Sequence, residues 1–65
     1  MSGHRKRVSG TLSKGRRGLI LTTDDNEVWV IDTDEDVAQL FGQRATVEGI
    51  PSGLDRLKVD WIGAA

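Results

Sequence analysis

The sequence of 65 residues contains no cysteine, one proline, one histidine and only three aromatic residues, none of them tyrosine. Without cysteine the chain offers no disulfide, no thiolate nucleophile and no zinc-thiolate ligand. No apolar run approaches the roughly 20 residues that a membrane-spanning helix requires, and the basic start lacks the apolar stretch of a signal peptide. We therefore expect a cytoplasmic protein that does not bind membranes.

Charge is strongly segregated along the chain. Residues 1–23 carry six basic and no acidic residues, whereas residues 24–65 carry three basic and ten acidic ones, which makes the first part +6 and the second −7. Such an asymmetry favours contact between the basic segment and a polyanion. Ordinary surface charge with a solubilising tail is the alternative interpretation.

Short segments of alternating apolar and polar residues predict five strands, over residues 8–13, 19–23, 28–32, 45–49 and 56–61. We expect residues 1–7 to form a flexible basic arm, residues 8–62 the only domain, and residues 63–65 a frayed end. The strand at 8–13 contains Gly10, which is typical of a bend or bulge in a small barrel.

A short helix is predicted over residues 34–41, between the third and fourth strands. Thr33 or Asp34 can cap its start, and its apolar residues follow helical spacing: Val37, Leu40 and Phe41. The order β-β-β-α-β-β predicts a mainly β protein, a small five-stranded OB-like antiparallel barrel with one short helix. An SH3-like barrel is the alternative, and it ranks second because such barrels have no helix between strands three and four.

Strands two and three are predicted to form a hairpin around residues 24–27, with two possible registers. A two-residue loop (25–26) places Trp29 and Ile31 on the face of Ile20. A three-residue loop (24–26), with Asn26 in the left-handed conformation, places them with Leu19 and Leu21. We favour the second register, because it gathers the largest apolar side chains on one face.

Both tryptophans are interpreted as core residues, and a surface platform for stacking nucleobases is the alternative for each. The predicted core combines the inward positions of the five strands with the apolar face of the helix: Val8, Leu12, Leu19, Leu21, Trp29, Ile31, Val37, Leu40, Phe41, Val47, Leu57, Val59 and Trp61.

No catalytic or metal-binding constellation is recognisable. The single histidine, His4, lies in the predicted arm, and the serines have no basic partner, so we expect neither an enzyme nor a cofactor. The acidic run at residues 32–36 begins like a calcium loop. An EF-hand loop requires glycine at position six and glutamate at twelve, where this chain has Val37 and Gln43, so no metal site is predicted.

Weak binding of single-stranded RNA or DNA through its backbone is the first functional hypothesis, because loops one–two and four–five of an OB barrel flank its binding face. The contacts would come from the basic arm and loops: Arg5, Lys6, Arg7, Lys14, Arg16, Arg17 and Arg56. The alternative is a protein-interaction or assembly module that meets another protein or a second copy. It would use the outer apolar face of the hairpin, formed by Ile20, Val28 and Val30.

Three stretches of the sequence together indicate a family resemblance. They are Arg7-Val8-Ser9-Gly10-Thr11-Leu12, Trp29-Val30-Ile31-Asp32, and residues 42–49 with the Ser52-Gly53-x-Asp55-x-Leu57-x-Val59 pattern. The chain resembles a group of very small, uncharacterised bacterial OB-like domains, which implies a fold and a bacterial origin. In layout it is also loosely similar to translation initiation factor one and S1-type barrels, which bind RNA.

Overall fold

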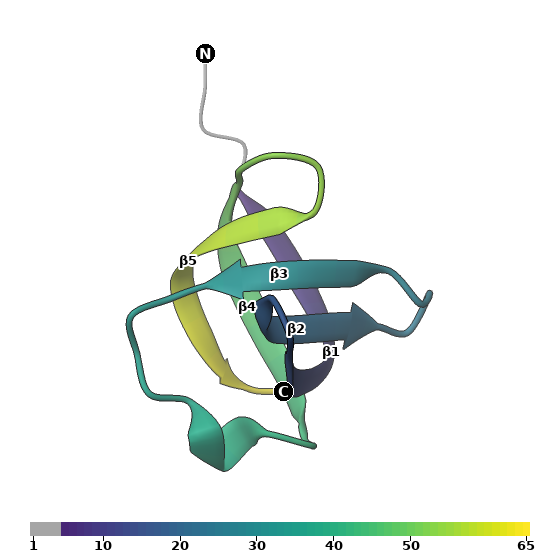
Figure 1. The fold of residues 1–65 in the computed structure, drawn as a ribbon, viewed down its shortest axis with the longest axis vertical. Helices are drawn as coiled ribbons and strands as arrows, with labels where there is room; N and C mark the ends of the chain where they lie inside the picture. Colours follow the sequence, from purple (N-terminus) through teal and green to yellow (C-terminus); the bar gives the residue numbers. More distant parts are fainter. Residues whose placement is uncertain (1–4) are drawn as a thin grey trace.

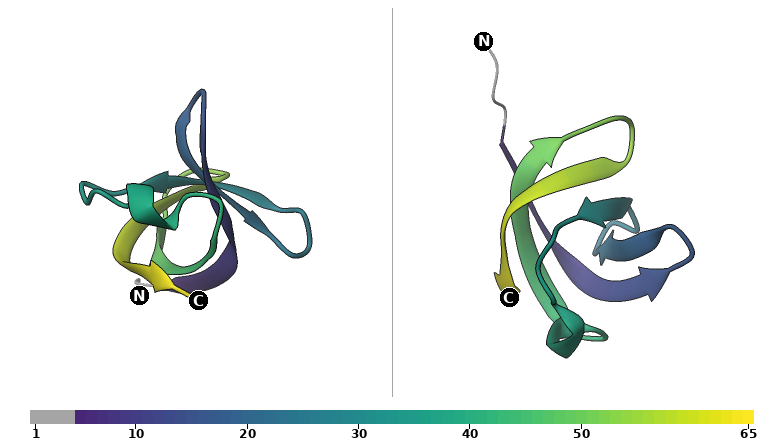
Figure 2. Two further views of the ribbon diagram at one scale, coloured as in Figure 1. Left: turned by 90° about the horizontal axis from the view of Figure 1, so that it is seen from below. Right: turned by 60° about the vertical axis from the view of Figure 1, so that its left-hand side comes forward.

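The computed structural model describes residues 5–65, and these form five strands and one helical turn (Figure 1). The elements follow in the order β1 (Lys6–Gly15), β2 (Gly18–Thr23), β3 (Val28–Asp32), η1 (Ala38–Leu40), β4 (Arg44–Pro51) and β5 (Arg56–Ala64). Neighbouring strands close into a barrel in the order β1-β2-β3-β5-β4, and the ring is visible on the left of Figure 2. The predicted fold class is confirmed.

Strand β1 closes the ring because its two halves pair with different strands. Residues from Lys6 to Thr11 lie antiparallel to β4, and residues from Gly10 to Gly15 lie antiparallel to β2. Strands β3 and β5 complete the barrel as its parallel pair, over three residue pairs only. The remaining pairings are antiparallel.

Both ends of the predicted domain differ from the observed strands. Strand β1 begins at Lys6, so the last two residues of the predicted arm belong to the sheet, and residues 1–4 lie outside the described residues. The prediction of a frayed end at 63–65 is wrong. Strand β5 runs to Ala64, which pairs with Ala45, and the Ala65 amide donates a hydrogen bond to the Arg44 carbonyl at 3.2 Å.

The β2–β3 hairpin has the predicted three-residue loop. The Thr23 amide donates to the Glu27 carbonyl at 2.8 Å, and Asn26 adopts a φ of 66°. This register places Leu21 opposite Trp29 and Leu19 opposite Ile31. The four side chains therefore share one face, as expected.

The helix between β3 and β4 is much shorter than predicted. Instead of eight helical residues, the structure has a single 3-10 turn, because Val37 is not helical at φ −117° and the preceding side chains bind the backbone locally. Thr33 Oγ1 accepts a hydrogen bond from the Glu35 amide, and Asp36 Oδ1 accepts one from the Ala38 amide, both at 3.2 Å. Such local bonds compete with helix formation. Between residues 5 and 65 no helix is long and apolar enough to cross a membrane.

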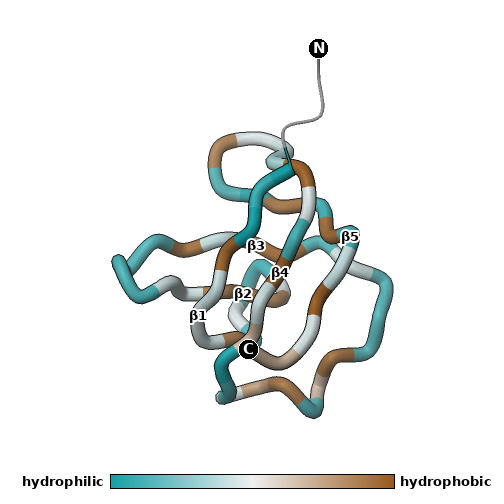
Figure 3. Tube along the Cα trace, turned by 180° about the vertical axis from the view of Figure 1, so that it is seen from behind, coloured by the Kyte–Doolittle hydropathy of each residue, from teal (hydrophilic) through white to brown (hydrophobic). Residues whose placement is uncertain are grey.

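The core lies inside the ring and consists of eight buried apolar side chains: Val8, Leu12, Leu21, Ile31, Val37, Ala45, Val47 and Leu57. Leu19, Trp29, Leu40, Val59 and Ile62 are partly buried and pack against them. Hydrophobic and hydrophilic segments alternate along the tube in Figure 3, as strands with one face inside a barrel require. Phe41 was expected in the core but is 37% exposed, because the single turn ends before it.

A β-bulge in β5 overturns the prediction that Trp61 is a core residue. Gly49 pairs with Val59 and Glu48 with Trp61, so β5 uses one more residue than β4 here, and Asp60 is the additional one. Because one extra residue reverses the alternation, Trp61 points to the outer face and Ile62 turns inward. Trp61 is accordingly 48% exposed.

Candidate functional site

The β1–β2 turn and the β4–β5 loop meet through a two-pronged ion pair. Arg17 Nη1 and Nη2 donate to the two carboxylate oxygens of Asp55 at 2.9 and 3.3 Å. These hydrogen bonds are the main reason why the pKa of Asp55 lies below its ordinary value. The contact also brings the neighbours of both residues, Arg16 and Arg56, to the same part of the surface.

Local backbone geometry holds both segments in place. Gly15 pairs with Gly18 across the turn, and Gly18 adopts a φ of 114°, which side chains other than glycine rarely tolerate. In the β4–β5 loop, the Asp55 carbonyl accepts a hydrogen bond from the Val30 amide at 2.7 Å. The loop is thereby attached to β3, and its residue Asp55 is positioned to receive Arg17.

Four predicted binding residues lie on or directly beside these two connected segments, and we call them the turn–loop patch: Lys14, Arg16, Arg17 and Arg56. All four are exposed, and among the described residues only Arg17 forms an ion pair. With Asp55 included, the patch carries a net charge of +3. This arrangement can hold a polyanion by several separate charge contacts.

The other predicted binding residues, Arg5, Lys6 and Arg7, lie at the opposite end of β1 and do not join this patch. Arg5 approaches Asp60 at 3.3 Å and Glu48 at 3.6 Å, and Arg7 approaches Glu48 at 3.6 Å. Each of these distances is longer than the 2.9 Å of the closest Arg17–Asp55 contact. The predicted contact residues therefore fall into two separate groups of cations.

Lys6 belongs to the mouth of the barrel because strand alternation places it on the face of the inward residue Val8. Its ammonium lies 5.5 Å from the centre of the Trp29 ring, which is a cation–π contact. The Trp29 Nε1 atom is buried and has no hydrogen-bond partner among the described residues. Trp29 therefore packs against the core at one end of the barrel and is not an open stacking platform.

An open pocket of about 260 Å³ lies beside Trp29 and is lined by Glu27, Val28, Trp29 and Leu54. Val28 is 50% exposed, and Leu54 in the β4–β5 loop is fully exposed. This small apolar surface contains only one member of the predicted interaction face. Ile20 is partly buried, and Val30 is only 1% exposed because the β4–β5 loop lies against β3.

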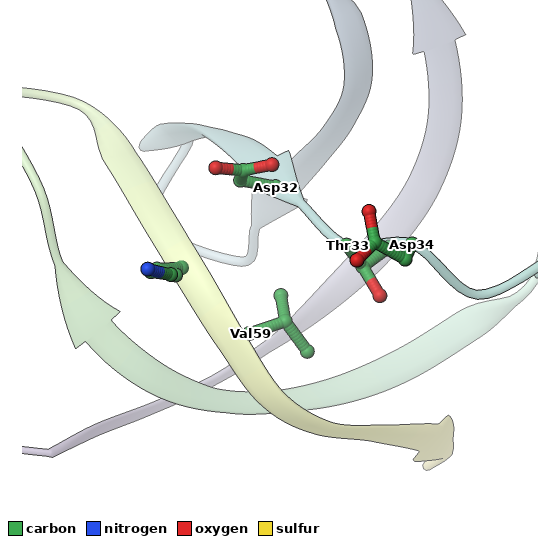
Figure 4. Close-up of a pocket in the computed structure, with 5 residues that line it drawn as sticks. Asp32, Thr33, Asp34 and Val59 are labelled. Carbon is green, nitrogen blue, oxygen red and sulfur yellow. The ribbon is translucent and has the colours of Figure 1, made fainter.

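A smaller depression of about 110 Å³ lies where β3 ends, and is lined by Asp32, Thr33, Asp34, Lys58 and Val59 (Figure 4). It contains two carboxylates and one ammonium. No group of three or more acidic, histidine or cysteine residues that could hold a metal ion occurs in the described part of the chain. The predicted absence of a calcium loop rests on the sequence, and His4 lies outside the described residues.

The fold and these surfaces define a small five-stranded β-barrel with exposed charged and apolar side chains. The chain belongs to the protein family of unknown function DUF5818, whose match spans residues 9–65. Comparisons with curated proteins and with solved structures gave no match.

Proposed function

We propose that this chain is a non-enzymatic, OB-type binding domain of bacterial origin that binds single-stranded RNA or DNA weakly in the cytoplasm. The observation that carries the proposal is the turn–loop patch, where the Arg17–Asp55 contact gathers cations from two distant segments of the chain. In OB barrels the corresponding two loops flank the oligonucleotide. The strand order of the barrel supports the same comparison.

Binding at this patch would be directed at phosphates. Arginine side chains bind phosphate oxygens through forked, charge-assisted hydrogen bonds, and these contacts carry no sequence information. A patch of net charge +3 on a chain of net charge −1 gives modest affinity that falls steeply with salt. We therefore expect little discrimination between base sequences.

Charge reversal at Arg16 and Arg56 tests the proposal. The double variant Arg16→Glu, Arg56→Glu should bind a mixed-sequence single strand more weakly than the native chain does. The slope of log affinity against log salt should flatten by about 1.4, because each lost phosphate contact of a single strand contributes about 0.7. Fluorescence anisotropy over a series of salt concentrations measures both quantities.

Arg44→Gln provides the matched control, because Arg44 is an exposed arginine that pairs with Asp24 outside the patch. It removes a positive charge elsewhere on the barrel, so its salt slope should stay close to that of the native chain. Equal effects of the control and the double variant would contradict the proposed site. The absence of binding by the native chain at low salt would reject nucleic-acid binding altogether.

A second candidate function is docking of a partner protein at the Val28–Leu54 surface. The specific observation in its favour is the full exposure of Leu54 beside the half-exposed Val28 at an open pocket. Such a surface fits a single apolar side chain of a partner or of a second copy. Sedimentation at increasing concentration should show self-association that the double variant Val28→Lys, Leu54→Lys abolishes. Unchanged sedimentation of the native chain would remove the second copy as the partner.

A further inference from the structure

The outer face of the barrel over β1, β4 and β5 carries an exposed tryptophan that neither functional hypothesis uses. Trp61 lies beyond the bulge at Asp60 and is 48% exposed. About half of this residue is therefore available for contact with a ligand.

Gly63 allows the Trp61 indole to lie against the strand. A Cβ atom at residue 63 would stand 2.8 Å from both Cζ2 and Cη2 of the indole, a distance that atoms in contact do not reach. The missing side chain thus leaves room for the six-membered ring beside the backbone. One side of the indole is supported, and about half of the side chain remains open to solvent.

The surface next to the indole is built from small residues. Gly63 pairs with Thr46 on β4, which in turn pairs with Ser9 on β1. A hydrogen bond of 2.8 Å joins the hydroxyl oxygens of Ser9 and Thr46. No long side chain belongs to this row, and Thr46 within it is buried at 7% exposure, so the surface beside the indole is low and closely packed.

Two arginine side chains belong to the same outer face as the indole. Arg7, Glu48 and Trp61 form one cross-strand row on the outer face, and Arg5 reaches Asp60, the residue before Trp61, at 3.3 Å. Both arginine side chains are more than half exposed. An aromatic plate beside guanidinium groups is the combination on which single strands stack their bases and rest their phosphates.

From this arrangement we propose that Trp61 is a base-stacking site for an unpaired nucleobase, with Arg5 and Arg7 on the same face for the adjoining phosphates. The inference rests on the proposed function and extends it to a second face, away from the turn–loop patch. Arg5 and Arg7 are balanced here by Glu48 and Asp60, so the contribution of this site comes from stacking rather than from net charge. Stacking is tolerant of base identity, because every base has a flat face.

The test compares two single strands that differ only in their bases. One is an oligodeoxyadenylate of about eight nucleotides, within the site size of a small barrel, and the other is an abasic strand of equal length. Trp61→Ala should weaken binding of the adenylate strand by roughly tenfold, the scale of one lost base–aromatic stack, and leave the abasic strand unaffected. Because salt acts on phosphate contacts, this factor should be the same at low and moderate salt.

Further variants separate stacking from a structural effect. Trp61→Phe keeps an aromatic face and should restore most of the lost affinity. Gly63→Ala keeps the indole but forces it away from the strand, so it should weaken binding of the adenylate strand and shift the Trp61 indole N–H signal in NMR spectra. Phe41→Ala, at an aromatic residue that is 37% exposed and outside both proposed sites, is the control and should change neither affinity.

The outcomes distinguish the two proposals. If Trp61→Ala binds both strands as the native chain does, the stacking site is overturned and the phosphate-binding patch stands. If the native chain binds neither strand at low salt, the proposed function fails and the stacking site fails with it. A tenfold loss for both strands would also overturn the stacking site, because the abasic strand has nothing to stack.

Discussion

Truncating each of the two tryptophans tests which of them packs against the core and which lies on the outer face of the barrel. Trp29 packs against the core at the barrel mouth, whereas Trp61 lies on the outer face beyond the bulge. Truncating a core tryptophan to alanine costs about 3–5 kcal/mol, and the partial burial of Trp29 places it at the lower end, about 3 kcal/mol. Trp61→Ala removes a half-exposed side chain and should cost about 1 kcal/mol or less.

The expected loss for Trp29→Ala is large relative to the total stability of the domain. A chain of this length has a free energy of unfolding of about 3–10 kcal/mol at the usual 0.05–0.15 kcal/mol per residue. Trp29→Ala should therefore lose a third or more of the stability, and Trp61→Ala should remain well folded. Urea unfolding followed by far-ultraviolet circular dichroism measures both, and Trp29→Phe provides a milder variant if Trp29→Ala does not fold. Equal losses for the two alanine variants would refute the assignment of inside and outside.

Two further predictions concern charge and backbone contact. Hydrogen bonds of 2.8 and 3.2 Å from Arg44 lower the pKa of Asp24, so this pair stabilises the fold above the ordinary aspartate pKa, and the stabilisation is lost as pH falls through the lowered value. In urea unfolding, Asp24→Asn should be less stable than the native chain at neutral pH, and the difference should vanish in strong acid; a constant difference would contradict the assignment. Gly10→Ala would place a Cβ atom 2.1 Å from the Thr22 carbonyl oxygen. At Gly42 a Cβ atom would meet no other atom, and the only strain would come from its φ of 79°. Gly10→Ala should therefore lower the melting temperature more than Gly42→Ala does. Equal melting temperatures would show that β1 and β2 are not in close contact there.

Much of the barrel could be predicted because strands with one buried face leave a period-two pattern in the sequence. Val8, Leu12, Leu21 and Val47 follow this pattern, and all are buried. The hairpin was predictable for a similar reason. Its three-residue loop gathers the largest apolar side chains of the two strands on one face, and Asn26 supplies the positive φ that this loop needs.

The missed features depend on contacts between distant segments. In β5 both Trp61 and Ile62 are apolar, and only pairing with β4 decides which of them turns inward. Val30 occupies an outward position, yet the β4–β5 loop covers it, and no local pattern reports that contact. The basic residues were recognised from composition, but their division into two groups follows from the length of β1 between Lys6 and Lys14.

The parallel pairing of β3 with β5 is the shortest strand pairing in the barrel, with three residue pairs, whereas the other pairings have four to seven. Opening the barrel at this pairing breaks the fewest interstrand contacts and leaves the antiparallel pairings intact. The product is an open five-stranded sheet with two unpaired edges, which are templates for pairing with another chain. Partial opening rather than complete unfolding is therefore the route by which this domain would exchange strands with its copies or begin to aggregate, and amide exchange should be fastest among the sheet residues along β3 and the start of β5.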